Sequence, residues 1–258
     1  MLIPLAQCFP PSIRAVWFLL LAALSLGAVL PVAAAPLYRV GVEDVDYYPI
    51  YAVSADNQYR GYARALLDLF AAHADIQLRY VPLPVRRLHH NYWAGRLDLI
   101  FPDSPRWNET GKPQGVITYS QPLLTFQDVM LVLPGRLGQP RERFRKLGFV
   151  RGFTPWKFQP EIAAGLVEIH QAPSPEGLIR MTLAGYIDGA NMARQVARYH
   201  LGKLERPYAL VEEPSLLPSS DSRYYLSSIR HPELIQRFDA FLHSERQAVA
   251  ALKAKYGL

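Results

Sequence analysis

The sequence contains almost no cysteine and none of the short motifs that mark several common enzyme classes. Its single cysteine, Cys8, lies in an N-terminal apolar segment, so the rest of the chain has no disulfide, thiol nucleophile or thiolate metal ligand. No Gly-x-Ser-x-Gly element, phosphate-binding P-loop or Gly-x-Gly-x-x-Gly element occurs. These absences argue against a serine hydrolase of the nucleophile-elbow type, a P-loop enzyme and a dinucleotide-dependent enzyme.

Metal-binding patterns are absent as well. There is no His-x-x-x-His or His-Glu-x-x-His spacing, and the adjacent His89 and His90 would diverge on a helix, so they cannot face one ion. Glu212 and Glu213 stand beside Pro214 and indicate a solvated loop rather than a catalytic carboxylate pair. We therefore expect no metal site, no cofactor and no catalytic residues.

The charge pattern makes nucleic acid a poor candidate partner. The formal net charge is +6, but the basic residues are interleaved with apolar ones and form no long run. With 258 residues, of which 50% are hydrophobic and 19% charged, the chain is predicted to fold as one large domain or two small ones. A small anionic ligand is compatible with this balance.

The first 34 residues have the order of a secretory signal peptide. Arg14 precedes an apolar run over residues 15–32, and the small residues Ala33, Ala34 and Ala35 follow. We expect cleavage after Ala34 and a periplasmic location. The alternative is an uncleaved membrane anchor, because a run of about 18 residues lies at the lower limit for a spanning helix.

Strand-like and helical patterns alternate along the remaining chain and predict an α/β fold. The first elements expected are a strand over 38–43, a helix over 61–75 and a strand from 76 to 81. Residues 76–101 and 167–191 form an internal near-repeat: each has a strand, Pro-x-Pro, a helix, Ala-Gly-x-Leu/Ile-Asp and a second strand. Two copies of this unit predict two similar lobes, each a mostly parallel sheet flanked by helices.

Two further segments are expected to join the lobes. The long apolar strand over 125–133 crosses from the first lobe to the second, and residues 222–228 return. The helical segment that follows His231 then rejoins the first lobe. The predicted division is residues 35–126 with 222–258 for lobe 1 and residues 127–221 for lobe 2, with a ligand cleft at the carboxyl ends of the strands.

The order of several short motifs resembles the extracellular solute-binding proteins of the amino-acid-importer type, which have the two-lobed periplasmic-binding fold. The matching stretches are 39–42, Tyr47-Tyr48-Pro49, Gly61, 94–98, 117–122, 147–152, 184–188 and 252–257. The resemblance implies hinge closure of a monomer around a small solute, and an ATP-driven importer as partner. Two alternatives stay open: a cleft enzyme of the dehydratase or lyase type on the same scaffold, and a ligand-sensing module for a membrane receptor.

The chain departs from this family in its ligand motifs. Members that bind free amino acids usually carry Thr-x-x-Arg after the first Gly-x-x-Asp strand, with the Arg holding the α-carboxylate, and an acid after the second for the α-amino group. Here the first region contains Asp103, Ser104, Arg106 and Trp107, with Lys112 further on; the second ends in Arg194 and has no acid. We expect Arg106 or Lys112 to bind a carboxylate. The missing acid argues against an ordinary α-amino acid as ligand.

Other candidate ligand contacts come from the predicted turns. Arg86 and Arg87 follow Pro-x-Pro, where one guanidinium could bind a carboxylate, although a solvated helix start is the alternative. Asp103 and Ser104 follow a strand end and could receive a ligand ammonium, or simply form a turn. The aromatic candidates for stacking and the backbone donors expected before a helix near Trp156 are Tyr47, Tyr48, Trp107, Gly152, Phe153 and Thr154.

Overall fold

A computed structural model describes residues 34–107, 111–217 and 221–258. Their strands form one sheet with the path β4-β1-β5-β12-β7-β10-β8-β9. The short strands β6 and β11 lie off this path and pair with β12 and β7, respectively. The bounds are β1 Leu37–Glu43, β4 Gln77–Leu83, β5 Leu99–Asp103, β6 Thr118–Tyr119, β7 Leu124–Val132, β8 Lys146–Val150, β9 Glu168–Ala172, β10 Gly189–Ala193, β11 Val211–Glu212 and β12 Asp221–Ser228. A separate hairpin pairs β2 (Ala52–Val53) with β3 (Tyr59–Arg60).

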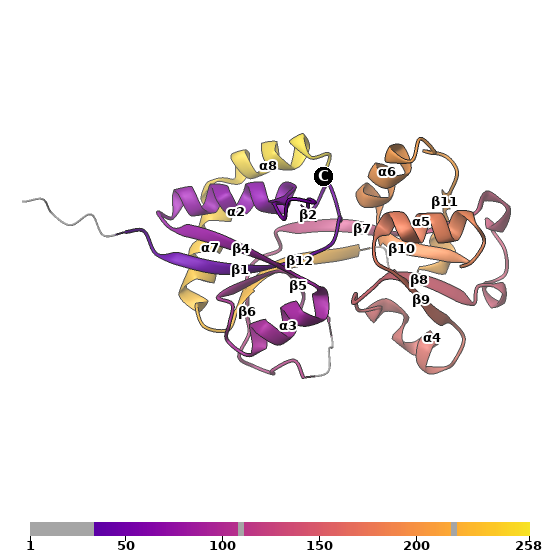
Figure 1. Cartoon of the computed structure of the whole chain (residues 1–258), viewed down its shortest axis with the longest axis horizontal. Helices are drawn as coiled ribbons and strands as arrows, with labels where there is room; N and C mark the ends of the chain where they lie inside the picture. The colour runs from indigo at the N-terminus through magenta and orange to yellow at the C-terminus, as the bar shows by residue number, and fades with distance from the viewer. Residues whose placement is uncertain (1–33, 108–110, 218–220) are drawn as a thin grey trace, which may run out of the picture. The chain divides into compact units, whose positions relative to one another are not determined.

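Strand direction divides this sheet into two similar halves (Figure 1). In the first half β1 pairs in parallel with both β4 and β5, and in the second half β8 pairs in parallel with β9 and β10. The antiparallel strands β12 and β7 lie between them and pair with each other, with Asp221 opposite Gln127 and Tyr224 opposite Leu124. We call the half with β1, β4 and β5 the first lobe and the half with β8, β9 and β10 the second lobe.

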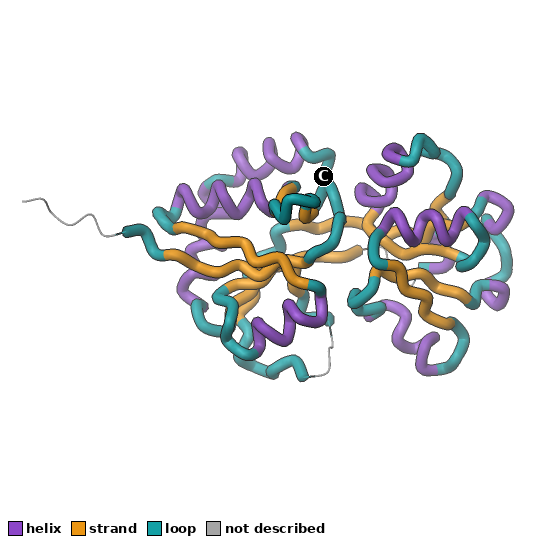
Figure 2. The backbone as a smooth tube through the Cα atoms, in the orientation of Figure 1, coloured by secondary structure: helices purple, strands orange, loops and turns teal. Residues whose placement is uncertain are grey.

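Helices cover both lobes (Figure 2). Their bounds are α2 Tyr62–His73, α3 Val85–Trp93, α4 Gln159–Ala163, α5 Pro175–Leu183, α6 Arg194–Lys203, α7 Pro232–Ser244 and α8 Arg246–Lys255. The C-terminal helices α7 and α8 pack on α2. Phe70 of α2 meets Phe238 and Phe241 of α7 edge-on or tilted, and all three rings are buried. Helix α2 and the C-terminal helix α7 therefore share one hydrophobic core, because residues spaced at helical intervals present these rings on one face.

The internal near-repeat is confirmed as two β-α-β units. The first is β4, α3 and β5, and the second is β9, α5 and β10. Gly95 and Gly185 follow the two helices with φ values of 71° and 72°, the left-handed conformation that closes a helix end. Pro175 opens α5, as expected for a proline in the first helical turn.

Residues 1–33 of the predicted signal peptide, Cys8 among them, lie outside the described residues. None of the helices in the described part of the chain has the length and apolar character needed to cross a bilayer.

Candidate functional site

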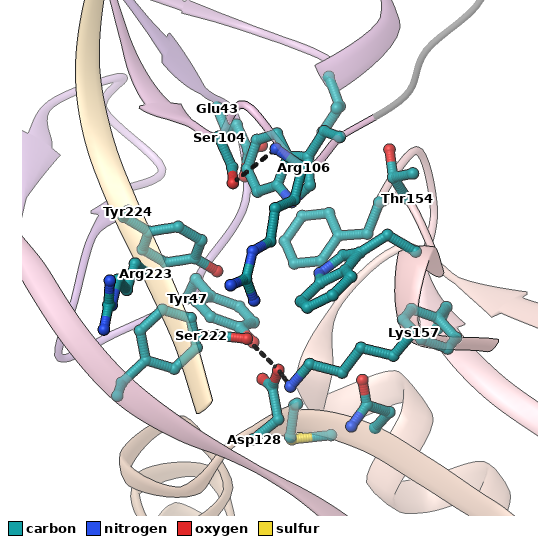
Figure 3. A pocket seen from close by; sticks show the side chains of 18 of the residues that line it. Glu43, Tyr47, Ser104, Arg106, Asp128, Thr154, Lys157, Ser222, Arg223 and Tyr224 are labelled. Atoms are coloured by element: carbon teal, nitrogen blue, oxygen red, sulfur yellow. Dashed lines mark hydrogen bonds and ion pairs between the residues drawn. The ribbon is translucent and has the colours of Figure 1, made fainter. Parts of the chain in front are cut away.

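A pocket opens where β7 and β12 meet the ends of the strands of both lobes, and we call it the central pocket (Figure 3). Its volume is about 800 Å³ with the space open to solvent included. The walls are mostly aromatic or apolar. The polar and charged residues that line it are Glu43, Ser104, Arg106, Asp128, Thr154, Lys157, Asn191, Ser222 and Arg223, together with the hydroxyls of Tyr47, Tyr224 and Tyr225.

Arg106 reaches into the middle of this pocket from the loop that follows β5 (Figure 3). Its backbone N–H donates to the Ser104 hydroxyl over 3.3 Å, and its guanidinium carbon lies 5.2 Å from the ring centroid of Trp156 in the second lobe. Within the described part of the chain, the guanidinium has no carboxylate partner. A solvent-accessible cation with an aromatic face on one side is suited to bind an anion on the other.

A buried ion pair lies on the opposite wall. The Lys157 ammonium is 2.6 Å from a carboxylate oxygen of Asp128, and the Ser222 hydroxyl donates to the same oxygen over 2.5 Å. The Lys157 side chain is only 3% exposed. Charges that are largely removed from water need such partners, since an uncompensated one is costly. Asp128 comes from β7, Ser222 from β12 and Lys157 from the second lobe, so the pair joins three segments.

Tyrosines hold the base of the pocket. The Tyr47 hydroxyl accepts the backbone N–H of Ala193 over 2.9 Å, which ties the loop after β1 to the start of α6. Burial, followed by the charge of Asp128, raises the pKa of Tyr47 far above its ordinary value. The Tyr51 hydroxyl donates to the buried carboxylate of Glu43. Burial, followed by the charge of Glu43, also raises the pKa of Tyr51. Both phenols therefore keep their protons at neutral pH and act as neutral hydrogen-bonding groups.

The two lobes approach each other closely at a second point. Gly152, which has a φ of 90°, lies against Val85 at the start of α3; a Cβ on this glycine would come within 2.8 Å of the Val85 Cβ. Both residues line the central pocket. A side chain at position 152 would therefore strain the backbone and separate the lobes.

Seven of the thirteen residues named from the sequence line the central pocket. They are Tyr47, Ser104, Arg106, Trp107, Gly152, Phe153 and Thr154. The other six, which do not line it, are Tyr48, Arg86, Arg87, Asp103, Lys112 and Arg194.

Asp103 and Lys112 instead shape the loop that carries Arg106. The Asp103 carboxylate accepts the Ser227 hydroxyl over 2.6 Å and the Ser104 N–H over 2.7 Å, while burial raises the pKa of Asp103. The Lys112 ammonium donates to the backbone carbonyls of Ser104 and Trp107 over 2.7 and 3.0 Å. Both side chains thus bind the chain itself, which positions the Arg106 backbone.

The remaining four residues have other contacts. Arg86 and Arg87 are exposed on α3. The ring of Tyr48 packs 4.5 Å from that of Tyr199 on α6. Arg194 forms an ion pair of 2.8 Å with Glu212.

Sequence reasoning missed the half of the pocket that β7, β12 and the Trp156 turn provide. A signal for one part was present: Phe126 and Asp128 are two residues apart on a strand and therefore share a face. A carboxylate within such an apolar strand indicates a buried partner, but nothing in the sequence identifies Lys157 as that partner. Among the described residues, no group of three or more His, Cys, Asp or Glu side chains could hold a metal ion.

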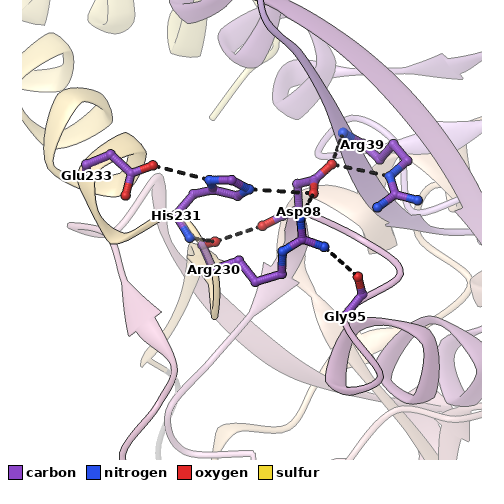
Figure 4. A network of polar contacts seen from close by, with 7 residues as sticks. Arg39, Gly95, Asp98, Arg230, His231 and Glu233 are labelled. Atoms are coloured by element: carbon purple, nitrogen blue, oxygen red, sulfur yellow. Dashed lines mark hydrogen bonds and ion pairs between the residues drawn. The ribbon is translucent and has the colours of Figure 1, made fainter.

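The repeated Gly-x-x-Asp motifs support the strands rather than the pocket (Figure 4). Asp98 accepts the Arg39 backbone N–H over 2.8 Å and lies 3.5 Å from the Arg230 guanidinium. Asp188 accepts the Arg145 N–H over 2.7 Å, at the same place in the second unit. Burial opposes ionisation of Asp98, but the hydrogen bonds from Arg39 and the nearby arginine charges outweigh it and lower the pKa of this carboxyl.

Comparisons with known proteins identify the fold. No protein-family model matches the sequence, and no curated protein sequence matches it. Among solved structures, an ancestral arginine-binding protein bound to arginine is similar with a TM-score of 0.70 and 14% identity, covering 87% of this chain and 99% of that one. A histidine kinase sensor domain with similarity to periplasmic binding proteins has a TM-score of 0.69 and 20% identity, covering 86% and 96%.

An ancestral amino acid-binding protein, described as a precursor of cyclohexadienyl dehydratase, is similar with a TM-score of 0.66 and 17% identity. The match covers 85% of this chain and 95% of that one. At these identities the likeness concerns the fold. The protein described here has the two-lobed α/β fold of the periplasmic binding proteins.

Proposed function

We propose that this protein is an exported solute-binding protein that captures a small carboxylate-bearing solute in the central pocket and delivers it to a membrane importer. One observation carries the proposal: the Arg106 guanidinium stands in a largely aromatic pocket between two lobes and, among the described residues, has no carboxylate partner. A guanidinium binds a carboxylate through two parallel charge-assisted hydrogen bonds. The aromatic walls would contact the apolar remainder of the solute.

The proposed mechanism follows from the fact that residues of both lobes line the pocket. Arg106 belongs to the first lobe and Trp156 to the second, so a solute held between them contacts both. Because both sets of contacts form only when the lobes are close together, the solute would favour the closed arrangement. An importer would then recognise that arrangement.

The proposal can be tested by removing the Arg106 charge. We would identify a binding carboxylate by native mass spectrometry of the purified protein and by thermal-shift screening of small mono- and dicarboxylates. Arg106→Gln should raise the Kd of that carboxylate by about 10- to 100-fold, because a hydrogen bond to a charged group contributes roughly 1.5–3 kcal/mol. Arg87→Gln is the matched control, since Arg87 is exposed and does not line the pocket. Equal affinities of Arg106→Gln and the control would contradict the proposal.

Binding rather than turnover is supported by the state of the nearby acids. Glu43 and Asp128 line the pocket, but hydrogen bonds from Tyr51, Lys157 and Ser222 hold their carboxylates. Asp103 does not line it. A bound carboxylate recovered with unchanged mass after prolonged incubation would agree with this; a converted product would identify a cleft enzyme instead.

A sensory role is the second candidate, because a histidine kinase sensor domain has the same fold. Cellular uptake separates the two roles. Deleting the gene should abolish uptake of the identified carboxylate if the partner is an importer. If the partner is a membrane sensor, uptake should persist while the transcriptional response to the carboxylate is lost.

A further inference from the structure

The charged residues that line the central pocket differ in whether they already have a partner within the chain. Its carboxylates are Glu43 and Asp128, and its cations are Arg106, Lys157 and Arg223. Glu43 accepts the Tyr51 hydroxyl, and Asp128 accepts both Lys157 and the Ser222 hydroxyl. Each carboxylate therefore already has partners within the chain, whereas the Arg106 guanidinium has no such counterion among the described residues. A ligand carboxylate can therefore pair with Arg106, whereas both pocket carboxylates already accept hydrogen bonds from within the chain.

Lys157 occupies the position at which a ligand ammonium would otherwise bind. Its ammonium lies 2.6 Å from the Asp128 carboxylate and 5.3 Å from the Trp156 ring centroid, with a side chain only 3% exposed. This is the arrangement that an ammonium group of a bound ligand would need: a carboxylate on one side and an aromatic face on the other. At this position a ligand ammonium would have to displace Lys157, and the other pocket carboxylate, Glu43, is buried and already accepts the Tyr51 hydroxyl.

We propose that Lys157 is a specificity-determining residue, which makes the pocket select carboxylates without an amino group over α-amino acids and amines of the same skeleton. The proposal rests on the proposed function, in that Arg106 binds the ligand carboxylate. Lys157 acts as an internal substitute for a ligand ammonium, and the aromatic walls contact the apolar part of the solute. The substrate class is a small aliphatic or aromatic carboxylate.

The test uses two sets of matched compounds on the protein purified from cells that express the full chain. The aromatic set is 3-phenylpropanoate, phenylalanine and 2-phenylethylamine; the aliphatic set is 4-methylpentanoate, leucine and 3-methylbutylamine. Calorimetric titration at pH 7.5 gives the Kd for each. In at least one set the acid should bind about tenfold or more tightly than the amino acid, and the amine should not bind.

Two variants connect this preference to Lys157. Lys157→Met leaves the Asp128 carboxylate free to accept a ligand ammonium, so the Kd ratio of amino acid to acid should fall by about tenfold or more. The double variant Lys157→Met/Asp128→Asn has no buried charge at this position and should not gain affinity for the amino acid. Because it lacks the uncompensated carboxylate, it also remains informative if the single variant is too unstable to fold.

The outcomes distinguish the two proposals. If the amino acid binds the natural protein as tightly as the acid, and Arg106→Gln weakens both, the specificity proposal is wrong and the carboxylate function stands. An unchanged Kd ratio in a folded Lys157→Met variant would overturn the role of Lys157 alone. If neither acid binds, the substrate class proposed here is wrong. If Arg106→Gln leaves acid binding unchanged, the proposed function itself fails.

Discussion

His89 and His90 are neighbours on α3 with opposite surroundings, and this difference predicts how stability depends on pH. His89 is 4% exposed and packs against Trp93 and Trp107, with ring centroids 5.6 and 6.2 Å away, whereas His90 is exposed. Burial, assisted by the charge of Lys112, lowers the pKa of His89 from 6.5 to about 4. In the unfolded chain the same imidazole titrates near 6.5.

The sign and size of the effect follow from linkage. Above about pH 7 both states carry neutral imidazole, and His89 adds no pH dependence. As the pH falls from about 6.5 towards 4, the unfolded chain binds a proton that the native protein does not, so the free energy of unfolding decreases. With pKa values of 6.5 and about 4, the loss at pH 5 is about 2 kcal/mol, approaching about 3 kcal/mol below pH 4.

Urea denaturation at pH 8 and pH 5 measures this loss. In His89→Gln the decrease in unfolding free energy between the two pH values should be about 2 kcal/mol smaller than in the natural protein. Any packing loss caused by the substitution cancels, because each variant is compared with itself. His90→Gln is the matched control, because it removes an exposed imidazole from the same helix. Equal pH dependence in His89→Gln and the natural protein would refute the reasoning.

Three further substitutions test the supports of the strands and of the pocket. In urea titrations at pH 7, Asp98→Ala should lower the free energy of unfolding by about 1–3 kcal/mol. Because the folded-state pKa of Asp98 is lowered, this difference from the natural protein should shrink below about pH 4. Gly152→Ala should weaken binding of the identified carboxylate in calorimetric titrations. The control is Gly165→Ala, which should not weaken it, because Gly165 also has a positive φ but nothing lies within 4 Å of its added Cβ. Tyr47→Phe removes the acceptor of the Ala193 N–H and should speed dissociation of the identified carboxylate, measured by stopped-flow fluorescence. An unchanged dissociation rate would show that this contact does not contribute to closure.

The β-α-β units were predictable because their signals are local. Pro175 at a helix start, Gly95 and Gly185 beyond helix ends and the strand patterns between them depend on backbone conformation and periodicity within a few residues. The crossing strands were expected at 125–133 and 222–228 and are found at Leu124–Val132 and Asp221–Ser228. The division of the chain into lobes at particular residues stays a prediction.

The pocket was only partly predictable. Residues next to a recognisable strand end, such as Ser104 and Arg106, could be named because strand ends in α/β sheets border a ligand crevice. Arg86 and Arg87 were equally plausible on that argument, yet Val85 is the α3 residue that lines the pocket. One residue along a helix turns the side chain by about 100°, so the packing of α3 on the sheet decides which side chain faces inward.

The sequence by itself determined that the chain is an α/β protein with two related β-α-β units and an Arg106 candidate for anion binding, since these depend on local periodicity, turn residues and neighbouring strand ends. Only the tertiary structure decided which carboxylates are already neutralised. Asp128 and Lys157 are separated by 29 residues and Asp128 and Ser222 by 94. Their pairing depends on how three segments pack, and a charge pattern along the chain carries no information about distances across it.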